Sequence, residues 1–265
     1  MIEQLIRYMR CPGCSGTSLH TVSGDVVCGG CSTRYPCEEG ILDMMPQSGG
    51  EVITPFQRLM QSPFVVGIYE RMWRRLGYFI ASSRSFDDEI ATVLRLQGGD
   101  ADGPALDLGC GTGVFTRPMA RRMRGVVVGL DLSRPMLRHA RRLAVCEGLD
   151  NIVLVRGTAF RLPFIAESFT HLNCCGALHL FDRPEPALTE MARVLHRGGR
   201  LSIQTTIRPS RSAGMAWFLE RFIRFGFFAE AGLREMMRRQ GFKIVESERH
   251  RISFTLLARH VSWRD

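Results

Sequence analysis

The chain has 265 residues, of which 45% are hydrophobic and 23% are charged. This composition suits one large globular domain, or a medium domain with a small one, and it excludes intrinsic disorder, collagen-like repeats and coiled coil. No apolar run approaches the roughly 20 residues of a membrane-spanning helix. Because the first residues also lack the apolar core of a signal peptide, we expect a cytoplasmic protein without a membrane span.

The net charge of +9 comes almost entirely from arginine, since Lys243 is the single lysine. Residues 1–50 hold three arginines and five acidic residues, a net of −2, so the basic excess lies in the rest of the chain. Arg134, Arg138 and Arg141 follow a helical spacing, which we interpret as the solvated outer face of an amphipathic helix. The alternative is a surface that binds RNA or an anionic substrate.

The N-terminal part of the chain contains two pairs of cysteines. Cys11-Pro-Gly-Cys14 and Cys28-Gly-Gly-Cys31 are separated by thirteen residues, with a predicted turn at 23–25 between them. Four thiolates at this spacing are typical of a closed tetrahedral zinc site, which has no open position for chemistry. We therefore predict a structural Zn²⁺ that holds a segment too short for its own core. A redox dithiol is the weaker alternative.

The other five cysteines are scattered, and we predict buried thiols for them: Cys37, Cys110, Cys146, Cys174 and Cys175. Residues 47–50 indicate a linker. Residues 55–97 then show helical periodicity, which predicts either a helix packed on the following domain or an aromatic cap over a pocket. The residues of this stripe are Phe64, Ile68, Tyr69, Met72, Trp73 and Leu76.

A short apolar strand, 105–108, continues into the glycine-rich turn Gly109-Cys110-Gly111-Thr112-Gly113 and then into a helix. Glycines at such a turn let a ligand approach the main chain closely. A second predicted strand, 126–131, ends at Asp131, where a carboxylate can accept both hydroxyls of a ribose. Asp131 could instead cap a helix together with Ser133, and Asp107 could be a buried structural acid. Asp107 on the first predicted strand, followed by Asp131 at the end of the second, favours a nucleoside site.

Two known families resemble this chain. Cys11 to Pro46, with its Tyr35-Pro36, Gly40-Ile41 and Pro46, resembles the zinc ribbon of the tRNA-methyltransferase activator subunit. Ala105 to Thr206 resembles class I S-adenosylmethionine (SAM) methyltransferases, in particular the subgroup with quinone and other small-molecule enzymes. That resemblance rests on the following motifs: Asp107 to Gly113, Asp131, Arg161-Leu162-Pro163-Phe164, Ala177-Leu178-His179, Met191 to Leu195 and Gly198-Gly199. Together the two parts resemble zinc-ribbon methyltransferases of plant chloroplasts and bacteria.

The resemblance implies an α/β, Rossmann-like sheet of seven strands with the last one antiparallel, continuing near 152–156, 169–175, 200–206, 242–247 and 252–259. It implies three parts: a zinc ribbon at 1–47, a helical cap at 48–98 and the SAM-binding domain at 99–265. The implied SAM-binding set is Asp107, Gly109, Cys110, Gly111, Gly113, Asp131, Leu132, Thr158, Ala159, Phe160 and Cys174. Thr158 departs from the family, which often has an aspartate there for the adenine amino group.

An aromatic insertion, residues 207–232, follows the fifth strand of this domain and predicts a lid, or a helix that closes the core. His179 follows the fourth strand, where the resemblance places it facing the methyl group. It is therefore the candidate general base, with a histidine satisfied by the backbone as the alternative.

Three functions compete. The first is methyl transfer from SAM to an apolar or aromatic small molecule by in-line displacement, which needs alignment and exclusion of water more than a base. The second is methylation of an rRNA or tRNA base, which the arginine excess favours. The third is a SAM-type fold that has become a cyclase or a scaffold.

Overall fold

The computed structural model describes residues 2–46, 74–98, 103–209 and 226–261. Its centre is a nine-stranded sheet with the order β11-β12-β10-β9-β6-β7-β8-β5-β4. Seven of these strands are the ones predicted from the sequence: β6 (Ala105–Leu108), β7 (Val127–Asp131), β8 (Ile152–Arg156), β9 (Phe169–Cys175), β10 (Leu195–Thr206), β11 (Phe242–His250) and β12 (Ser253–His260). Strands β6 to β10 run parallel to one another, whereas β12 is antiparallel to both β10 and β11. The α/β fold and its antiparallel last strand are confirmed.

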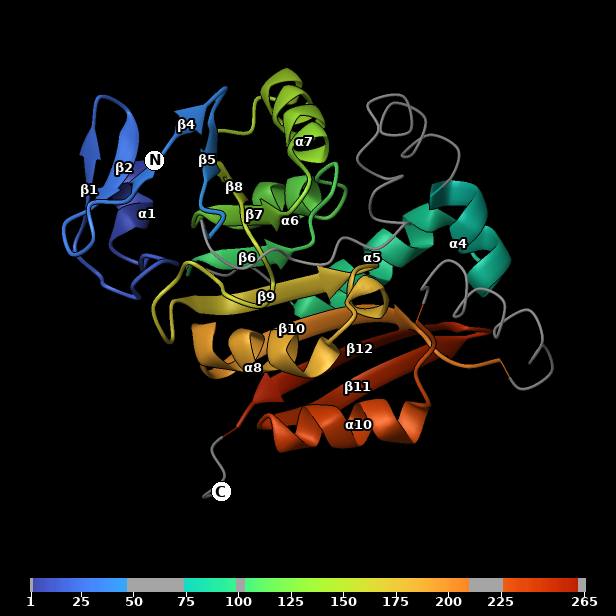
Figure 1. Ribbon diagram of the computed structural model, residues 1–265. Helices are drawn as coiled ribbons and strands as arrows, with labels where there is room; N and C mark the ends of the chain where they lie inside the picture. Colours follow the sequence, from blue (N-terminus) through green and yellow to red (C-terminus); the bar gives the residue numbers. More distant parts are fainter. Residues whose placement is uncertain (1, 47–73, 99–102, 210–225, 262–265) are drawn as a thin grey trace.

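Two further strands reach this sheet from the N-terminal segment. β4 (Cys37–Glu38) and β5 (Ile41–Asp43) form a hairpin, and β5 pairs in parallel with β8 through Leu42 and Val155. The sheet therefore has nine strands, two more than the predicted seven. The physical reason is that β8 would otherwise expose an unpaired edge, which β5 satisfies with main-chain hydrogen bonds. The end of the cysteine-rich segment is thus part of the main sheet (Figure 1).

The cysteine-rich segment also has a small sheet of its own. After the helix α1 (Ile2–Ile6), the strands β1 (Leu19–Val22), β2 (Asp25–Cys28) and β3 (Arg34–Tyr35) pair in sequence order. Ser23 and Gly24 join β1 to β2 with positive φ angles of 53° and 90°. Two successive residues with positive φ suit a tight hairpin turn, so the predicted turn is confirmed.

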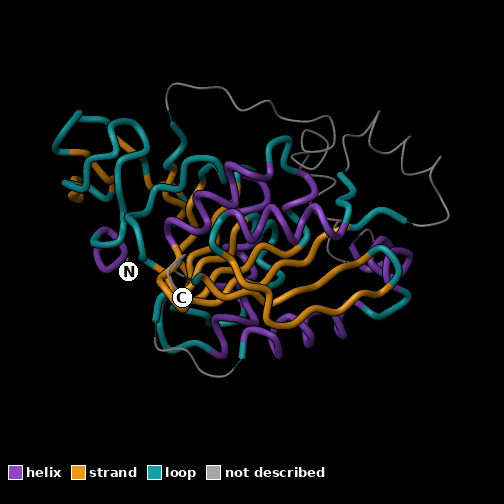
Figure 2. The backbone as a smooth tube through the Cα atoms, turned by 90° about the horizontal axis from the view of Figure 1, so that it is seen from below, coloured by secondary structure: helices purple, strands orange, loops and turns teal. Residues whose placement is uncertain are grey.

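Helices cover both faces of the main sheet (Figure 2). One face packs against α5 (Phe86–Gln97), α6 (Thr116–Arg122) and α7 (Arg134–Cys146), and the other against α8 (Pro184–Val194) and α10 (Glu230–Arg239). The helix α4 (Arg74–Ser82) packs through Tyr78 against Phe86 of α5. The Ser85 side chain begins α5 with a capping box to Asp88, which satisfies main-chain donors of its first turn.

The arginine face of α7 meets the N-terminal hairpin. Arg134 lies 2.8 Å from Glu38, and Arg138 lies 2.5 Å from Glu39. Arg138 is 52% exposed, as a solvated outer face predicts, whereas Arg134 is 27% exposed and partly covered by the hairpin. They pair with the acidic segment whose net charge is −2. Each side chain is partly exposed, so each pair contributes up to about 1 kcal/mol.

Several expectations concern residues outside the described ranges. The stripe from Phe64 to Trp73 lies there, and so does most of the 207–232 insertion. Leu76, the last residue of the stripe, is 60% exposed in α4. The ends of the insertion meet, because Ile207 forms a bridge with Phe228. In the part of the chain that the structure describes, no helix is long and apolar enough to cross a membrane.

The pairing of β5 with β8 predicts that the N-terminal segment contributes to the stability of the sheet. Leu42 is fully buried, and Leu42→Ala should lower the free energy of unfolding by about 2–5 kcal/mol through lost burial and a cavity. Urea unfolding measures this change. Val245→Ala is the control, since Val245 is 55% exposed. A loss below about 1 kcal/mol for Leu42→Ala would contradict the assignment of β5 to the core.

Candidate functional site

The predicted site residues gather at the carboxyl ends of the parallel strands β6, β7, β8 and β9. Strand β6 lies at the centre, with β7 on one side and β9 on the other, so chain order reverses direction there. In open α/β sheets this switch point is the usual place for a ligand. The turn after β6 begins with Gly109, whose N–H donates to the Leu130 carbonyl at 2.8 Å, next to Asp131.

The glycines of this turn adopt backbone angles that other residues rarely adopt. Gly109 has a φ of +71°, and a Cβ there would lie 2.5 Å from the Ala177 Cβ. The turn and the segment that leads to His179 therefore lie against each other. Gly111 has a φ of +54°, and a Cβ there would meet no atom of the described residues within 4 Å. Within that part of the chain, the main chain at Gly111 is open, as a cradle for a ligand requires.

Asp131 joins the glycine turn to the start of α7. Its Oδ2 accepts a hydrogen bond from the Gly111 N–H at 2.8 Å, and its Oδ1 accepts one from the Ser133 N–H at 2.8 Å. Ser133 is the residue that caps α7, because its Oγ accepts from the Met136 N–H. Asp131 therefore ties the glycine turn to the first turn of α7.

Asp107 is buried at 2% exposure and binds side chains of the protein on both oxygens. Oδ1 accepts from the Asn173 side chain at 2.7 Å, and Oδ2 accepts from the Thr116 hydroxyl at 2.5 Å. Sequence reasoning missed Asn173 and Thr116. The available signal was the amide of Asn173 among the apolar residues Leu172, Cys174 and Cys175 of a predicted strand. The register of β6 and β9 then pairs Asn173 with Asp107. The geometry indicates that Asp107 fixes the turn.

Two cysteines of the predicted SAM-binding set direct their sulfurs into the protein interior. Cys110 is 3% exposed and Cys174 is fully buried. Burial, with the nearby charges of Asp131 and Asp107, raises the pKa of Cys110 well above its usual value, and burial also raises the pKa of Cys174. Both are buried thiols, as predicted, and their side chains are not nucleophiles. Cys175 is buried as well and Cys37 is half-buried, but the prediction is wrong for Cys146, which is exposed at the C-terminal end of α7.

Residues 158–160 form the loop after β8. The Thr158 hydroxyl accepts a hydrogen bond from the Phe160 N–H at 3.1 Å. The Phe160 ring packs edge to face on Phe181 at 5.8 Å, and the Arg183 guanidinium lies 5.1 Å from the Phe160 ring centre. Phe181 follows the short helix that contains His179. This loop and the segment after β9 therefore form one wall of the site.

His179 lies in the helical turn η2 (Leu178–Leu180), which follows β9. It is 8% exposed, and its Nδ1 is 3.5 Å from the Thr205 hydroxyl. Its carbonyl accepts from the Gly226 N–H at 2.8 Å, so the described end of the 207–232 insertion contacts this residue. The imidazole thus contacts β10, whereas the main chain of His179 contacts the end of the insertion.

The four N-terminal cysteines form a separate cluster. The Sγ atoms of Cys11, Cys14, Cys28 and Cys31 all lie within 4.8 Å of one another. Cys11 and Cys31 are 3.6 Å apart, and so are Cys14 and Cys28. Four sulfurs about 2.3 Å from a tetrahedral Zn²⁺ would be about 3.8 Å apart, so this donor set suits zinc.

Comparisons with known proteins agree with this architecture. Residues 106–203 match the family profile described as a methyltransferase domain. An uncharacterized chloroplastic methyltransferase of Arabidopsis thaliana is 31% identical over 221 residues, which cover 79% of this chain and 62% of that protein. A 2-phytyl-1,4-naphtoquinone methyltransferase of Thermosynechococcus vestitus is 37% identical over 125 residues, which cover 45% of this chain and 54% of that protein.

A solved structure shares the fold. A chain from the complex between the Haloferax volcanii Trm112 methyltransferase activator and a methyltransferase superposes with a TM-score of 0.63 at 18% identity, covering 80% of this chain and 100% of that one. Residues 106–203 therefore match a methyltransferase domain in sequence, and the chain shares the α/β, Rossmann-like fold of methyltransferases. The chain spans 51–62% of the length of the first curated relatives it matches.

The two glycine environments predict different costs for the same substitution. Gly111→Ala introduces only left-handed strain, about 1–2 kcal/mol of unfolding free energy. Gly109→Ala introduces the same strain and also a steric overlap with Ala177, which should lower the free energy of unfolding by about 1–3 kcal/mol more. Urea unfolding of the two variants provides the comparison. Equal losses would contradict the close packing of Gly109 against Ala177.

Proposed function

We propose that this protein transfers a methyl group from SAM to an apolar or aromatic small molecule. The observation that carries the proposal is the Asp131 carboxylate, which ends β7 at the switch point of the sheet and accepts hydrogen bonds from the main chain of the glycine turn at Gly111 and of Ser133. The open space at Gly111 fits a nucleoside that approaches the main chain. The naphthoquinone methyltransferase among the relatives supports the chemical class of the acceptor.

Bound SAM supplies a methyl group that is already activated on a sulfonium. The protein therefore has to align the acceptor with that methyl group and exclude water. Gly111 lets the main chain approach the ligand, whereas Gly109 and Gly113 let the turn pack against Ala177 and Ala140. Asp131 takes the ribose, and the loop 158–160 lies at the adenine side. His179 accepts a proton where the acceptor must lose one, since an imidazole can do so near neutral pH.

Base methylation of RNA receives less support. Several arginines of the basic excess are paired with acids: Arg134 with Glu38, Arg138 with Glu39, and Arg121 with Glu147 at 2.5 Å. A cyclase or scaffold role predicts SAM binding without methyl transfer, so turnover of SAM separates it from our proposal. A cytoplasmic location stays a prediction, since the Arabidopsis relative is named chloroplastic.

Asp131→Asn tests the nucleoside site. It removes the charge that favours ribose hydroxyls while keeping one acceptor oxygen, so we expect the dissociation constant of S-adenosylhomocysteine (SAH) to rise about 10- to 100-fold. Isothermal titration calorimetry measures the affinity. Asp87→Asn is the control, because Asp87 is exposed on α5. Equal SAH affinity in the Asp131 variant and the wild type would contradict the proposal.

We also propose that Cys11, Cys14, Cys28 and Cys31 hold one structural Zn²⁺. Metal analysis of the purified chain should find one zinc atom per chain. The double variant Cys11→Ser with Cys28→Ser should lose it, because hydroxyls are poor zinc ligands. Cys146→Ser, at an exposed cysteine outside the cluster, should keep it. Zinc at full occupancy in the double variant would overturn this assignment.

A further inference from the structure

The loop that carries Thr158 and Phe160 is held by the N-terminal segment. Residues Tyr8–Arg10 run antiparallel to it, with a bridge between Met9 and Phe164. The Ile165 N–H donates to the Tyr8 carbonyl at 2.9 Å, and the Arg10 N–H donates to the Pro163 carbonyl at 3.1 Å. These contacts join residues about 150 positions apart in the chain.

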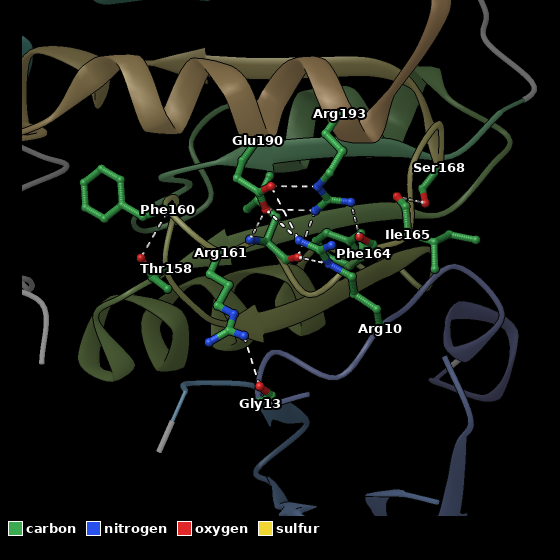
Figure 3. A network of polar contacts seen from close by, with 11 residues as sticks. Arg10, Gly13, Thr158, Phe160, Arg161, Phe164, Ile165, Ser168, Glu190 and Arg193 are labelled. Atoms are coloured by element: carbon green, nitrogen blue, oxygen red, sulfur yellow. Dashed lines mark hydrogen bonds and ion pairs between the residues drawn. The ribbon is translucent and has the colours of Figure 1, made fainter. Parts of the chain in front are cut away.

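Glu190 of α8 is the centre of the polar network around this loop (Figure 3). Its carboxylate accepts from the Leu162 N–H at 2.7 Å, from Arg193 at 2.6 Å and from Arg10 at 3.3 Å. Arg193 also donates to the carbonyls of Leu162 and Phe164, and Arg10 donates to the Leu162 carbonyl. The network therefore binds both main-chain polar groups of Leu162.

The network is largely shielded from water. The side chains of Glu190, Arg10 and Arg193 are 13%, 21% and 23% exposed. Burial by itself would raise the pKa of Glu190, but the hydrogen bonds and charge of Arg193, with the Leu162 N–H and Arg10, outweigh it and lower that pKa. Glu190 is thus ionised at neutral pH. Its loss would leave two poorly hydrated guanidinium groups without their shared partner.

A second chain of contacts reaches the ribose side of the site. Asp43 of β5 accepts from the Arg156 guanidinium at 2.9 Å, and its side chain is 14% exposed. The Nε of Arg156 donates to the Leu132 carbonyl at 3.1 Å. Leu132 directly follows Asp131. The N-terminal segment therefore contacts, through one intervening side chain, the residue next to the predicted ribose ligand.

We propose that Arg10 with Glu190, and Asp43 with Arg156, are positioning residues of the SAM site. They hold the 158–160 loop and the Asp131-Leu132 turn in the geometry that binds the nucleoside, so affinity for SAM depends on contacts made by the N-terminal segment. This inference rests on the proposed function. It assigns these four side chains a role in ligand affinity in addition to any role in stability.

The test compares Glu190→Gln and Asp43→Asn with the wild type. Both variants keep the size of the side chain and remove its charge. SAH affinity is measured by calorimetry at a temperature where circular dichroism shows each variant folded. We expect the dissociation constant to rise at least fivefold in each. With SAM and an accepted quinone substrate, KM for SAM should rise while kcat changes less than twofold.

Glu38→Gln is the matched control, since Glu38 lies in the same segment and pairs with Arg134 but is 61% exposed. It should leave SAH affinity unchanged. Arg10→Lys is the milder variant if Glu190→Gln does not fold. It keeps the positive charge but loses the guanidinium group, which donates to both Glu190 and the Leu162 carbonyl. It should raise the dissociation constant less than Arg10→Ala. Hydrogen exchange of the 158–164 peptide should be faster in Arg10→Ala than in Glu38→Gln.

The outcomes separate the two proposals. If the wild type does not bind SAH, the proposed function fails and this inference fails with it. If the wild type binds SAH and the folded variants bind it equally well, only the inference is overturned. A lower melting temperature with unchanged affinity and unchanged KM would likewise assign these residues to stability alone.

Discussion

The site depends on one buried carboxylate. Asp107 is 2% exposed, and a charge so far from water is tolerated only when its oxygens have partners. Asn173 and Thr116 supply them, which ties β6 to β9 and to the first turn of α6. The glycine turn lies between Asp107 near the end of β6 and Thr116 at the start of α6. Asp131 then holds the turn from the next strand through the Gly111 N–H.

The second organising feature is charge complementarity within the chain. The N-terminal segment is acidic, whereas the rest of the chain is rich in arginine. Arg134 and Arg156 both reach Asp43, and Arg138 reaches Glu39. Partly exposed pairs contribute little stability individually. Their combined effect, with the strand pairing of β5 and β8, is to define where the segment docks.

Local patterns predicted much of the fold. The resemblance to class I methyltransferases implied five of the seven strands from β6 to β12. The other two, β6 and β7, and the Ser23-Gly24 turn follow from apolar runs and turn residues close together in sequence. Strands β4 and β5 could not be predicted from such patterns, because two or three residues show too little periodicity to indicate a strand. Their pairing depends on the free edge of β8, which exists only after the sheet has formed. Asn173 was missed for a similar reason, since its partner Asp107 is 66 residues away.

The sequence by itself determined the chemistry that is available: the four thiols at zinc spacing, the glycine turn, and Asp131 at the end of a strand. These are short-range features, for which residue type and spacing suffice. Only the tertiary structure decided that the arginines of α7 face the N-terminal hairpin and that Glu190 joins Arg10 to Leu162. Such contacts depend on packing between segments that are distant in sequence. The partner of a buried charge is therefore set by which segments pack together, and not by sequence spacing.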